Sequence, residues 1–283
     1  AVYVGAAGGL VVVGLLAAGW GSNNKWSLLG GVRAVAQIVS YEIPVGVCVA
    51  GVVLWCGSMD LTRIIAQQDG GALTCSGWNL VQSPFLLLLA MVFFIGSLAE
   101  CHRTPFDTAE AESELVSGYN TELSGFRWGL FALAEYVEMF LVGAFFSVLF
   151  LGGYQLPLYD HAVSALPPLL ETAIHGGVLL AKTCAVVALM IWLRWTLPRL
   201  RIDAVMRLSW LTLLPLSLLG LAGLAVSVGA FGVVERGGAL RVDLSWLEWA
   251  ASWALALTAA WWLARSAARR RGAMHPALKK LTG

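Results

Sequence analysis

Residues 81–99 read VQSPFLLLLAMVFFIGSLA, a run of 19 positions without a charged side chain. Such a run is long enough to cross the hydrocarbon core of a bilayer as a helix, which takes about 20 apolar residues. Backbone polar groups in lipid must hydrogen-bond within the protein, so spanning segments are either helices or strands of a closed barrel. The alternation of polar and apolar residues that a barrel strand needs is absent, and the run therefore predicts a transmembrane helix.

Similar runs recur along the 283-residue chain, in which 59% of the residues are apolar and 12% are charged. The sequence therefore predicts an all-α fold, a polytopic transmembrane helix bundle of about seven spans. The predicted spans are roughly 1–20, 38–57, 81–99, 127–150, 172–194, 209–231 and 246–264. Between the first two, apolar residues interleave with Lys25 and Arg33, which predicts a short interfacial helix over 21–37 that extends into the second span.

Basic residues are distributed unevenly between the two sides of this predicted bundle. Fourteen lie on one side: Lys25, Arg33, Arg103, Arg127, Arg194, Arg199, Arg201, Arg207, Arg265, Arg269, Arg270, Arg271, Lys279 and Lys280. Three lie on the other side, Arg63, Arg236 and Arg241, while Lys182 falls within a span. Since Lys and Arg are enriched on the cytoplasmic side of membrane proteins, the first side is predicted to face the cytoplasm or an organelle matrix.

Several ionisable residues lie within the predicted spans. Glu42 is in the second span, Glu135 and Glu138 share a helix face in the fourth, and Lys182 is in the middle of the fifth, on the same face as His175. Each charge at the bilayer centre costs about 2.5–3.5 kcal/mol on insertion scales. A local ion pair or a side chain that reaches the interface would explain any one of them. Together they favour a path for protons or ions through the membrane.

The segment ECHRTPFDTAEAESELVSGYNTE, residues 100–122, joins two of the spans and is rich in carboxylates. It carries Glu100, Asp107, Glu110, Glu112, Glu114 and Glu122. If 106–117 is helical, Asp107, Glu110 and Glu114 share one face and repel each other, while Glu112 points away. Apolar residues interleave with these acids, which disfavours a plain solvated loop. The regular ligand spacing of an EF-hand is absent, so we expect no metal site here.

Four stretches of the sequence match one known family. They read GWGSNNKWSLLGGVRAVAQIVSYEIPVG (19–46), AECHRTPFDTAEAESELVSGYNTELSG (99–125), FALAEY (131–136) and LLAKTCAVVALMIWLRWTLPRLRIDAVMRLSWLTLLPLSL (179–218). In these stretches the sequence closely resembles the quinone-site membrane subunit of respiratory complex I, known as the H subunit in bacteria and as NADH dehydrogenase subunit 1 in mitochondria.

The resemblance implies a role as a subunit of a proton-pumping NADH:ubiquinone oxidoreductase, not catalytic alone. The subunit would form part of the quinone cavity and of an acidic path into the membrane arm. The path residues it implies are Glu114, Glu110, Asp107 and Glu100 near the cavity and Glu135 and Glu42 deeper in, with Glu112 and Glu122 in the same acidic loop. Charge pairing of the loops would fall to Arg103, Arg194, Arg199, Arg201 and Lys182.

By the same resemblance, ubiquinone is the expected substrate at the interface with peripheral-arm subunits, and this chain binds no metal or flavin. The implied partners are the peripheral-arm quinone-site and terminal iron–sulfur subunits, small membrane subunits and lipids, with no nucleic acid. Residues 1–231 would form the subunit core, and 232–283 a C-terminal extension with one further span and a basic tail.

The chain departs from the family pattern in several places. The family's N-terminal quarter is absent from this sequence, and we expect a separate polypeptide to supply it. Thr108-Ala109 replaces the pair usual before the Glu-Ala-Glu-Ser-Glu-Leu run. The absent N-terminal portion and the missing initial Met favour the mitochondrial inner membrane, with the bacterial plasma membrane as the alternative.

Two other functions compete with this interpretation. One is the homologous membrane subunit of an ion-translocating hydrogenase, which shares the fold and part of the acidic pattern. The complete acidic run and the Ala-Glu-Tyr motif at 134–136 favour complex I. The other is a secondary transporter, which we disfavour because inverted repeats and interrupted helices are absent from the sequence.

Overall fold

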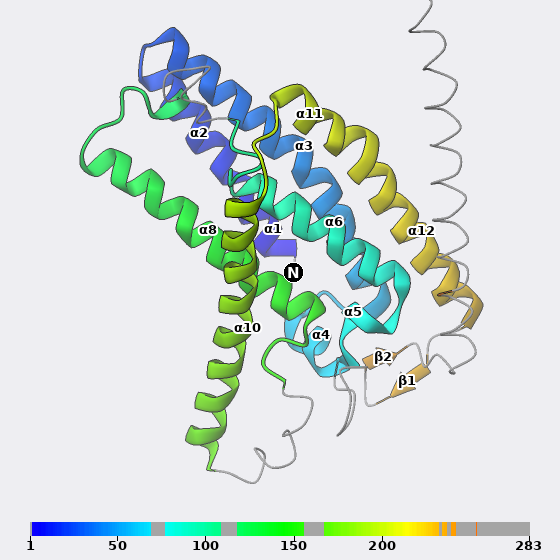
Figure 1. The fold of residues 1–283 in the computed structure, drawn as a ribbon. Helices are drawn as coiled ribbons and strands as arrows, with labels where there is room; N and C mark the ends of the chain where they lie inside the picture. Colours follow the sequence, from blue (N-terminus) through cyan, green and yellow to red (C-terminus); the bar gives the residue numbers. More distant parts are fainter. Residues whose placement is uncertain are drawn as a thin grey trace, which may run out of the picture.

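The computed structural model describes residues 2–68, 77–108, 118–155, 167–231, 234–236, 239–241 and 253. Long helices lie side by side in this part of the chain (Figure 1). In chain order the elements are α1 (Val2–Gly8), α2 (Leu10–Gly21), α3 (Lys25–Cys56), α4 (Leu61–Gln67), α5 (Asn79–Gln82), α6 (Pro84–Glu100), the 3-10 turn η2 (Gly118–Asn120), α8 (Phe126–Phe150), α10 (Pro168–Thr196), α11 (Ile202–Leu208), the π-helical turn η3 (Ser209–Leu213), α12 (Leu214–Phe231), β1 (Val234–Arg236) and β2 (Ala239–Arg241). The predicted helix bundle is confirmed.

Six of the seven predicted spans correspond to apolar helices. Four helices are long and apolar enough to cross a membrane: Lys25–Cys56, Phe126–Phe150, Pro168–Thr196 and Ile202–Gly229. The shorter apolar helices Gly5–Gly21 and Pro84–Glu100 match the first and third predicted spans. The seventh predicted span, 246–264, lies outside the described residues except for Trp253. A short antiparallel pair, β1 with β2, was not predicted, although Gly237-Gly238 between the two strands is a dipeptide typical of hairpins.

α3 is one continuous helix of 32 residues, so the predicted interfacial segment and the second span are a single element. Its start is fixed by Asn24, whose side-chain oxygen accepts a hydrogen bond from the Trp26 N–H at 3.1 Å. Its end is fixed by Gly57, which adopts the left-handed conformation with φ 63°. The sequence has no helix-breaking residue near position 37, where the predicted interfacial helix meets the second span, and the helix is continuous there.

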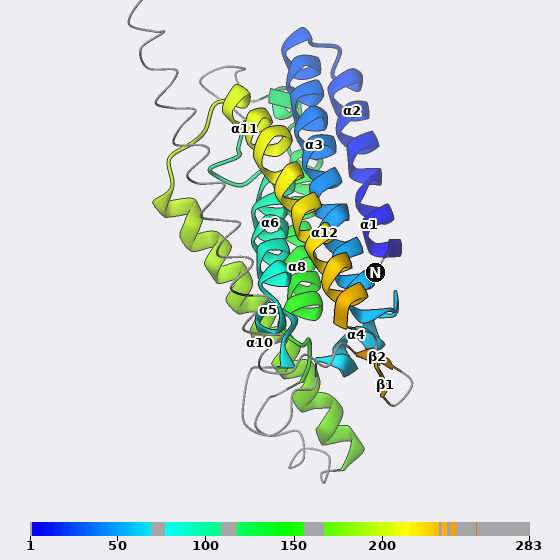
Figure 2. The same ribbon diagram turned by 90° about the vertical axis from the view of Figure 1, so that its right-hand side faces the viewer.

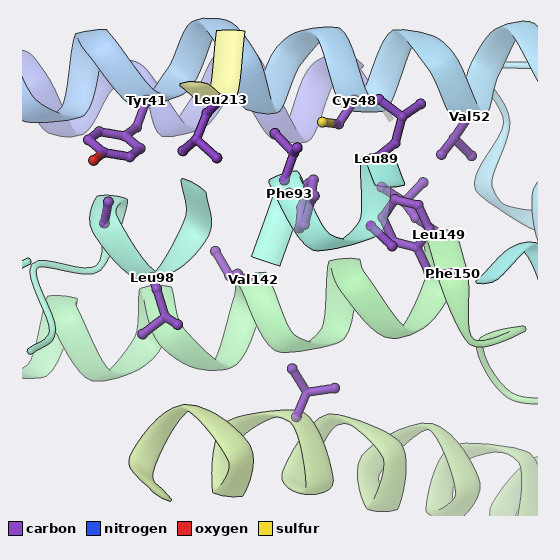
Figure 3. Packing of buried hydrophobic residues seen from close by; sticks show 14 of the residues in the cluster. Tyr41, Cys48, Val52, Leu89, Phe93, Leu98, Val142, Leu149, Phe150 and Leu213 are labelled. Carbon is purple, nitrogen blue, oxygen red and sulfur yellow. The ribbon is translucent and has the colours of Figure 1, made fainter. Parts of the chain in front are cut away.

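The core lies where α3, α6, α8 and α12 pack together. Figure 3 shows Cys48 and Val52 of α3 on the side that faces Leu89 of α6, with Phe150 of α8 beside them. Rings of α8 surround Phe93 with centroid distances of 5.8–6.0 Å. This packing fixes the relative positions of the helices that carry the buried carboxylates.

One end of the bundle gathers several connections. The turn between α2 and α3, the chain after α6, η2 and the link from α10 to α11 all lie there (Figures 1 and 2). The backbone N–H of Leu200 donates to the carbonyl of Pro105 at 3.0 Å, which ties the last link to the chain after α6. Gly30 permits a close approach, because a Cβ atom there would lie 2.6 Å from the backbone of Gly118. These connections carry Arg103, Arg199 and Arg201, and the structure thus places these three basic residues at the same end of the bundle.

Candidate functional site

The chain that leads into the acidic segment is anchored on α3 by one buried carboxamide. Gln37 has no exposed surface, and its Nε2 group donates to the carbonyls of Ala99 and Phe106, both at 2.8 Å. The hydroxyl of Thr108 donates to Oε1 of Gln37. Every polar atom of the carboxamide is therefore used to hold residues 99–108 in place. One turn later, the Tyr41 ring packs on Phe106 at 5.7 Å.

Glu135 in α8 is linked to both described edges of the acidic segment. Its Oε1 accepts a hydrogen bond from the Tyr119 hydroxyl at 3.0 Å, and its Oε2 lies 3.8 Å from Nη2 of Arg103. The side chains of Arg103 and Glu135 are only 12% and 18% exposed. Arg103 also lies over the Tyr136 ring, with Cζ 4.4 Å from the centroid. The Arg103–Glu135 contact is long for an ion pair, so a modest shift of either loop would change it.

Three further carboxylates lie deeper in the bundle, each from a different helix. Glu100 ends α6 and lies within electrostatic reach of Glu138 on α8 and Glu42 on α3. Glu138 is in turn influenced by Glu135, one turn away on the same helix. The Glu42 carboxylate faces α2, since a Cβ atom at Gly9 would lie 3.3 Å from its Oε1. A change of charge at one of these carboxylates therefore acts on the next through the electrostatic field.

Other predicted acids are placed differently. Asp107 lies within electrostatic reach of Glu135, at the start of the acidic segment. Glu122 is exposed, and its carboxylate accepts a hydrogen bond from the Asn24 side chain at 2.7 Å. Glu110, Glu112 and Glu114 lie outside the described residues.

The predicted charge-pairing residues also fall into separate groups. Arg103 contacts Glu135, as described above. Arg194, Arg199 and Arg201 are exposed, and none forms an ion pair within 4.0 Å with another described residue. Lys182 lies in α10 and contacts the chain after α8. Its ammonium group donates to the carbonyls of Leu151 (2.7 Å) and Gln155 (2.8 Å), and so it stabilises the carboxyl end of α8.

Two ionisable side chains in the connection after α6 are buried and uncharged at neutral pH. Burial lowers the pKa of His102 from 6.5 to about 4, although a hydrogen bond to the backbone of Ala34 opposes this shift. Burial also raises the pKa of the Cys101 thiol well above its usual value, and the carboxylates of Glu138 and Glu100 add to the shift. Neither group therefore adds a charge beside Arg103 at neutral pH.

The arrangement brings together a buried arginine, two tyrosines and several coupled carboxylates that extend from a loop at one end of the bundle into its interior. Such a set can pass protons along and respond to charge at the loop. Within the described residues, no group of three or more His, Cys, Asp or Glu side chains is arranged to hold a metal ion.

Some residues that form contacts in the candidate site were not among the predicted site residues. Gln37, Thr108 and Tyr119 act through hydrogen bonds, which carry no charge pattern that a sequence would reveal. Glu138 had been noted as a charge within a span but given no role, although its i, i+3 spacing from Glu135 was visible.

Comparisons with known proteins match most of the chain to a single family. A family model described as NADH dehydrogenase matches residues 1–225. The H subunit of NADH-quinone oxidoreductase from Geobacillus thermodenitrificans (strain NG80-2) is 46% identical over 230 residues, which cover 81% of this chain and 63% of that protein. Subunit 8 of the same enzyme from Rhodothermus marinus is 43% identical over 225 residues, 78% of this chain and 64% of the relative. The chain therefore spans just under two thirds of the length of these relatives.

Proposed function

Because this chain belongs to the NADH dehydrogenase family, we propose that it is a membrane subunit of a proton-pumping NADH:quinone oxidoreductase. In this role it forms part of the wall of a quinone cavity, with ubiquinone as the expected substrate, and part of the acidic path into the membrane. Support comes from the names of its relatives, which are subunits of NADH-quinone oxidoreductases. Residues 1–231 are the proposed core, and the family match over 1–225 supports that boundary.

The observation that carries the mechanism is the position of Glu135. Its carboxylate lies inside a membrane helix and contacts Tyr119 and Arg103, which flank the acidic segment at its two described edges. A change of charge at a quinone beside that segment would act on Arg103 and Tyr119 first. Their contacts with Glu135 would then alter its charge, which acts on Glu138 and through it on Glu100, which lies within electrostatic reach of Glu42.

The proposed partners are the peripheral-arm subunits that carry the quinone headgroup site and the terminal iron–sulfur cluster, together with neighbouring membrane subunits. Glu110, Glu112 and Glu114 remain proposed members of the acidic path. The relatives reported above are bacterial, which favours the bacterial plasma membrane over the mitochondrial inner membrane. The basic residues favour an orientation in which the acidic segment faces the cytoplasm.

Replacing Glu135 with Gln tests this proposal, because Gln keeps the shape of the side chain but cannot carry a proton. In membranes that hold the whole assembly, Glu135→Gln should lower NADH oxidation linked to quinone by about 100-fold, the low end of the range that proton-transfer groups contribute. Electron transfer from NADH to ferricyanide, which bypasses the quinone, should stay unchanged.

The matched control is Glu171→Gln, the same substitution in α10 at a partly exposed carboxylate whose ion-pair partner is His175, 3.9 Å away. Both activities should stay at the wild-type level in this control. Equal quinone-linked activity in Glu135→Gln and the wild type would refute the role of Glu135. Equal loss of both activities would indicate failed assembly, and the amount of assembled complex on a native gel would identify that case.

A further inference from the structure

A groove with a volume of about 520 Å³ lies along α11 and η3. Its lining residues are Arg201, Asp203, Ala204, Arg207, Leu208, Leu211 and Thr212. Two arginines and one aspartate give these described lining residues a formal charge of +1. None of the described carboxylates assigned to the proton path lines it, although Arg201 is also one of the predicted charge-pairing residues.

The charged side chains of the groove are exposed and available. Arg201, Asp203 and Arg207 form no ion pair within 4.0 Å with any residue in the described part of the chain. Asp203 and Arg207 are one turn apart on α11, a spacing at which such a pair often forms. The guanidinium groups are therefore free to bind an external anion, and their planar donor geometry matches the oxygens of a phosphate.

Three of the four other described lining residues, Ala204, Leu208 and Leu211, are apolar, which points to a ligand with a hydrophobic part. Leu211 is 75% exposed, and the exposed Leu218 lies two turns further along the same helix face. Both belong to the apolar span Ile202–Gly229, so the arginines stand at a membrane edge and the leucines continue toward the membrane interior. Trp195 and Trp210, both exposed, lie near this edge, where tryptophan is enriched in membrane proteins.

We propose that this groove binds an anionic phospholipid, with the phosphate headgroup held by Arg201 and Arg207 and an acyl chain lying along Leu211 and Leu218. An acidic segment of a partner protein would satisfy the arginines equally well. It would leave the exposed apolar stripe below them uncovered, whereas a phospholipid matches both parts at the correct depth. The proposal requires only that the chain spans a membrane, and it does not depend on the proposed enzymatic role.

Lipid retention measures this binding directly. The purified assembly is reconstituted in nanodiscs of equal parts phosphatidylglycerol and phosphatidylcholine, then extracted in mild detergent, and its retained lipids are counted by native mass spectrometry. The wild type should retain phosphatidylglycerol in preference to phosphatidylcholine. Each of Arg201→Gln and Arg207→Gln should lower that preference about fivefold, the effect expected for one basic residue near an anionic surface.

Arg127→Gln is the matched control, because Arg127 is an exposed arginine at the start of α8 that does not line the groove. It should leave the preference unchanged. Equal retention in the groove variants, the control and the wild type would overturn the proposal.

A photoreactive residue identifies the occupant. p-Benzoylphenylalanine in place of Leu211 should form adducts with phosphatidylglycerol in the intact assembly, and Arg207→Gln should reduce them. The same probe in place of Leu141, an exposed residue within the α8 span, should label both lipids without preference. Adducts of the Leu211 probe with another protein subunit instead of lipid would overturn the proposal.

Discussion

Replacing Gln37 with Leu should release the chain that leads into the acidic segment. Leu has a similar volume but cannot hydrogen-bond, so the carbonyls of Ala99 and Phe106 and the hydroxyl of Thr108 each lose a buried partner. The two carbonyls each keep a second hydrogen bond, from the backbone N–H groups of His102 and Thr108. The penalty for each group is therefore at the low end of the usual range, about 1 kcal/mol.

Three such losses lower the free energy needed to open the connection after α6 by about 3 kcal/mol, a factor of about 100 in the open population. Thr108→Val removes only the hydroxyl and leaves Oε1 of Gln37 without its donor. It should lower the opening free energy by about 1 kcal/mol, a factor of about five.

The adjacent Cys101 reports this opening, because its side chain has no exposed surface. A thiol reagent reaches it only when residues 101–108 open, so the labelling rate is proportional to the open population. Labelling of the intact assembly with a maleimide, followed by mass spectrometry of the peptide that contains Cys101, gives the rate. It should rise about 100-fold in Gln37→Leu and about fivefold in Thr108→Val.

The control is Thr172→Val, which removes a hydroxyl that bonds only within its own helix, to the Pro168 carbonyl at 2.8 Å. Its Cys101 labelling rate should equal that of the wild type. The reasoning fails if Gln37→Leu labels no faster than Thr172→Val, since the carboxamide would then not hold the connection.

Three further predictions follow from other buried contacts. The pKa of His102 is about 4 in the folded protein and near 6.5 in the unfolded chain. The neutral side chain therefore makes its full contribution to the free energy of unfolding above pH 6.5, and this contribution is lost as the pH falls toward 4. Thermal unfolding between pH 7 and 5 should show a loss of about 2 kcal/mol that His102→Asn lacks. Lys182→Met should destabilise the carboxyl end of α8 by about 2 kcal/mol, seen as faster hydrogen exchange in the chain after that helix, because two carbonyls lose a charged donor. Gly30→Ala should lower quinone-linked activity by pushing η2 away from α3, since its Cβ would lie 2.6 Å from Gly118, whereas Gly46→Ala, with no atom within 4 Å, should not.

The fold could be predicted from the sequence to the extent that it depends on apolar runs. Span positions followed from composition, because a helix in lipid needs a fixed length of apolar residues. The helix that contains the predicted sixth span, 209–231, begins earlier, at Ile202, and includes Asp203 and Arg207, which interrupt the apolar run in the sequence.

The candidate site could be predicted only where it consists of charges within apolar surroundings. Glu42 and Glu135 stand out for that reason, and Glu100 as part of the carboxylate-rich segment 100–122. Gln37 could not be identified, because its role depends on carbonyls 62 and 69 positions away in the sequence. The contacts of Lys182 after α8 could not be predicted for the same reason, since the hydrogen-bond partners described above are backbone carbonyls that no sequence pattern identifies.

Mass spectrometry of the intact assembly, extracted in mild detergent through an affinity tag on this chain, tests the proposed function most directly. We predict that flavin-containing and iron–sulfur subunits of an NADH dehydrogenase are isolated with the chain, and that the assembly reduces quinone with NADH. Isolation of a nickel hydrogenase subunit in their place would contradict the proposal and assign the chain to an ion-translocating hydrogenase.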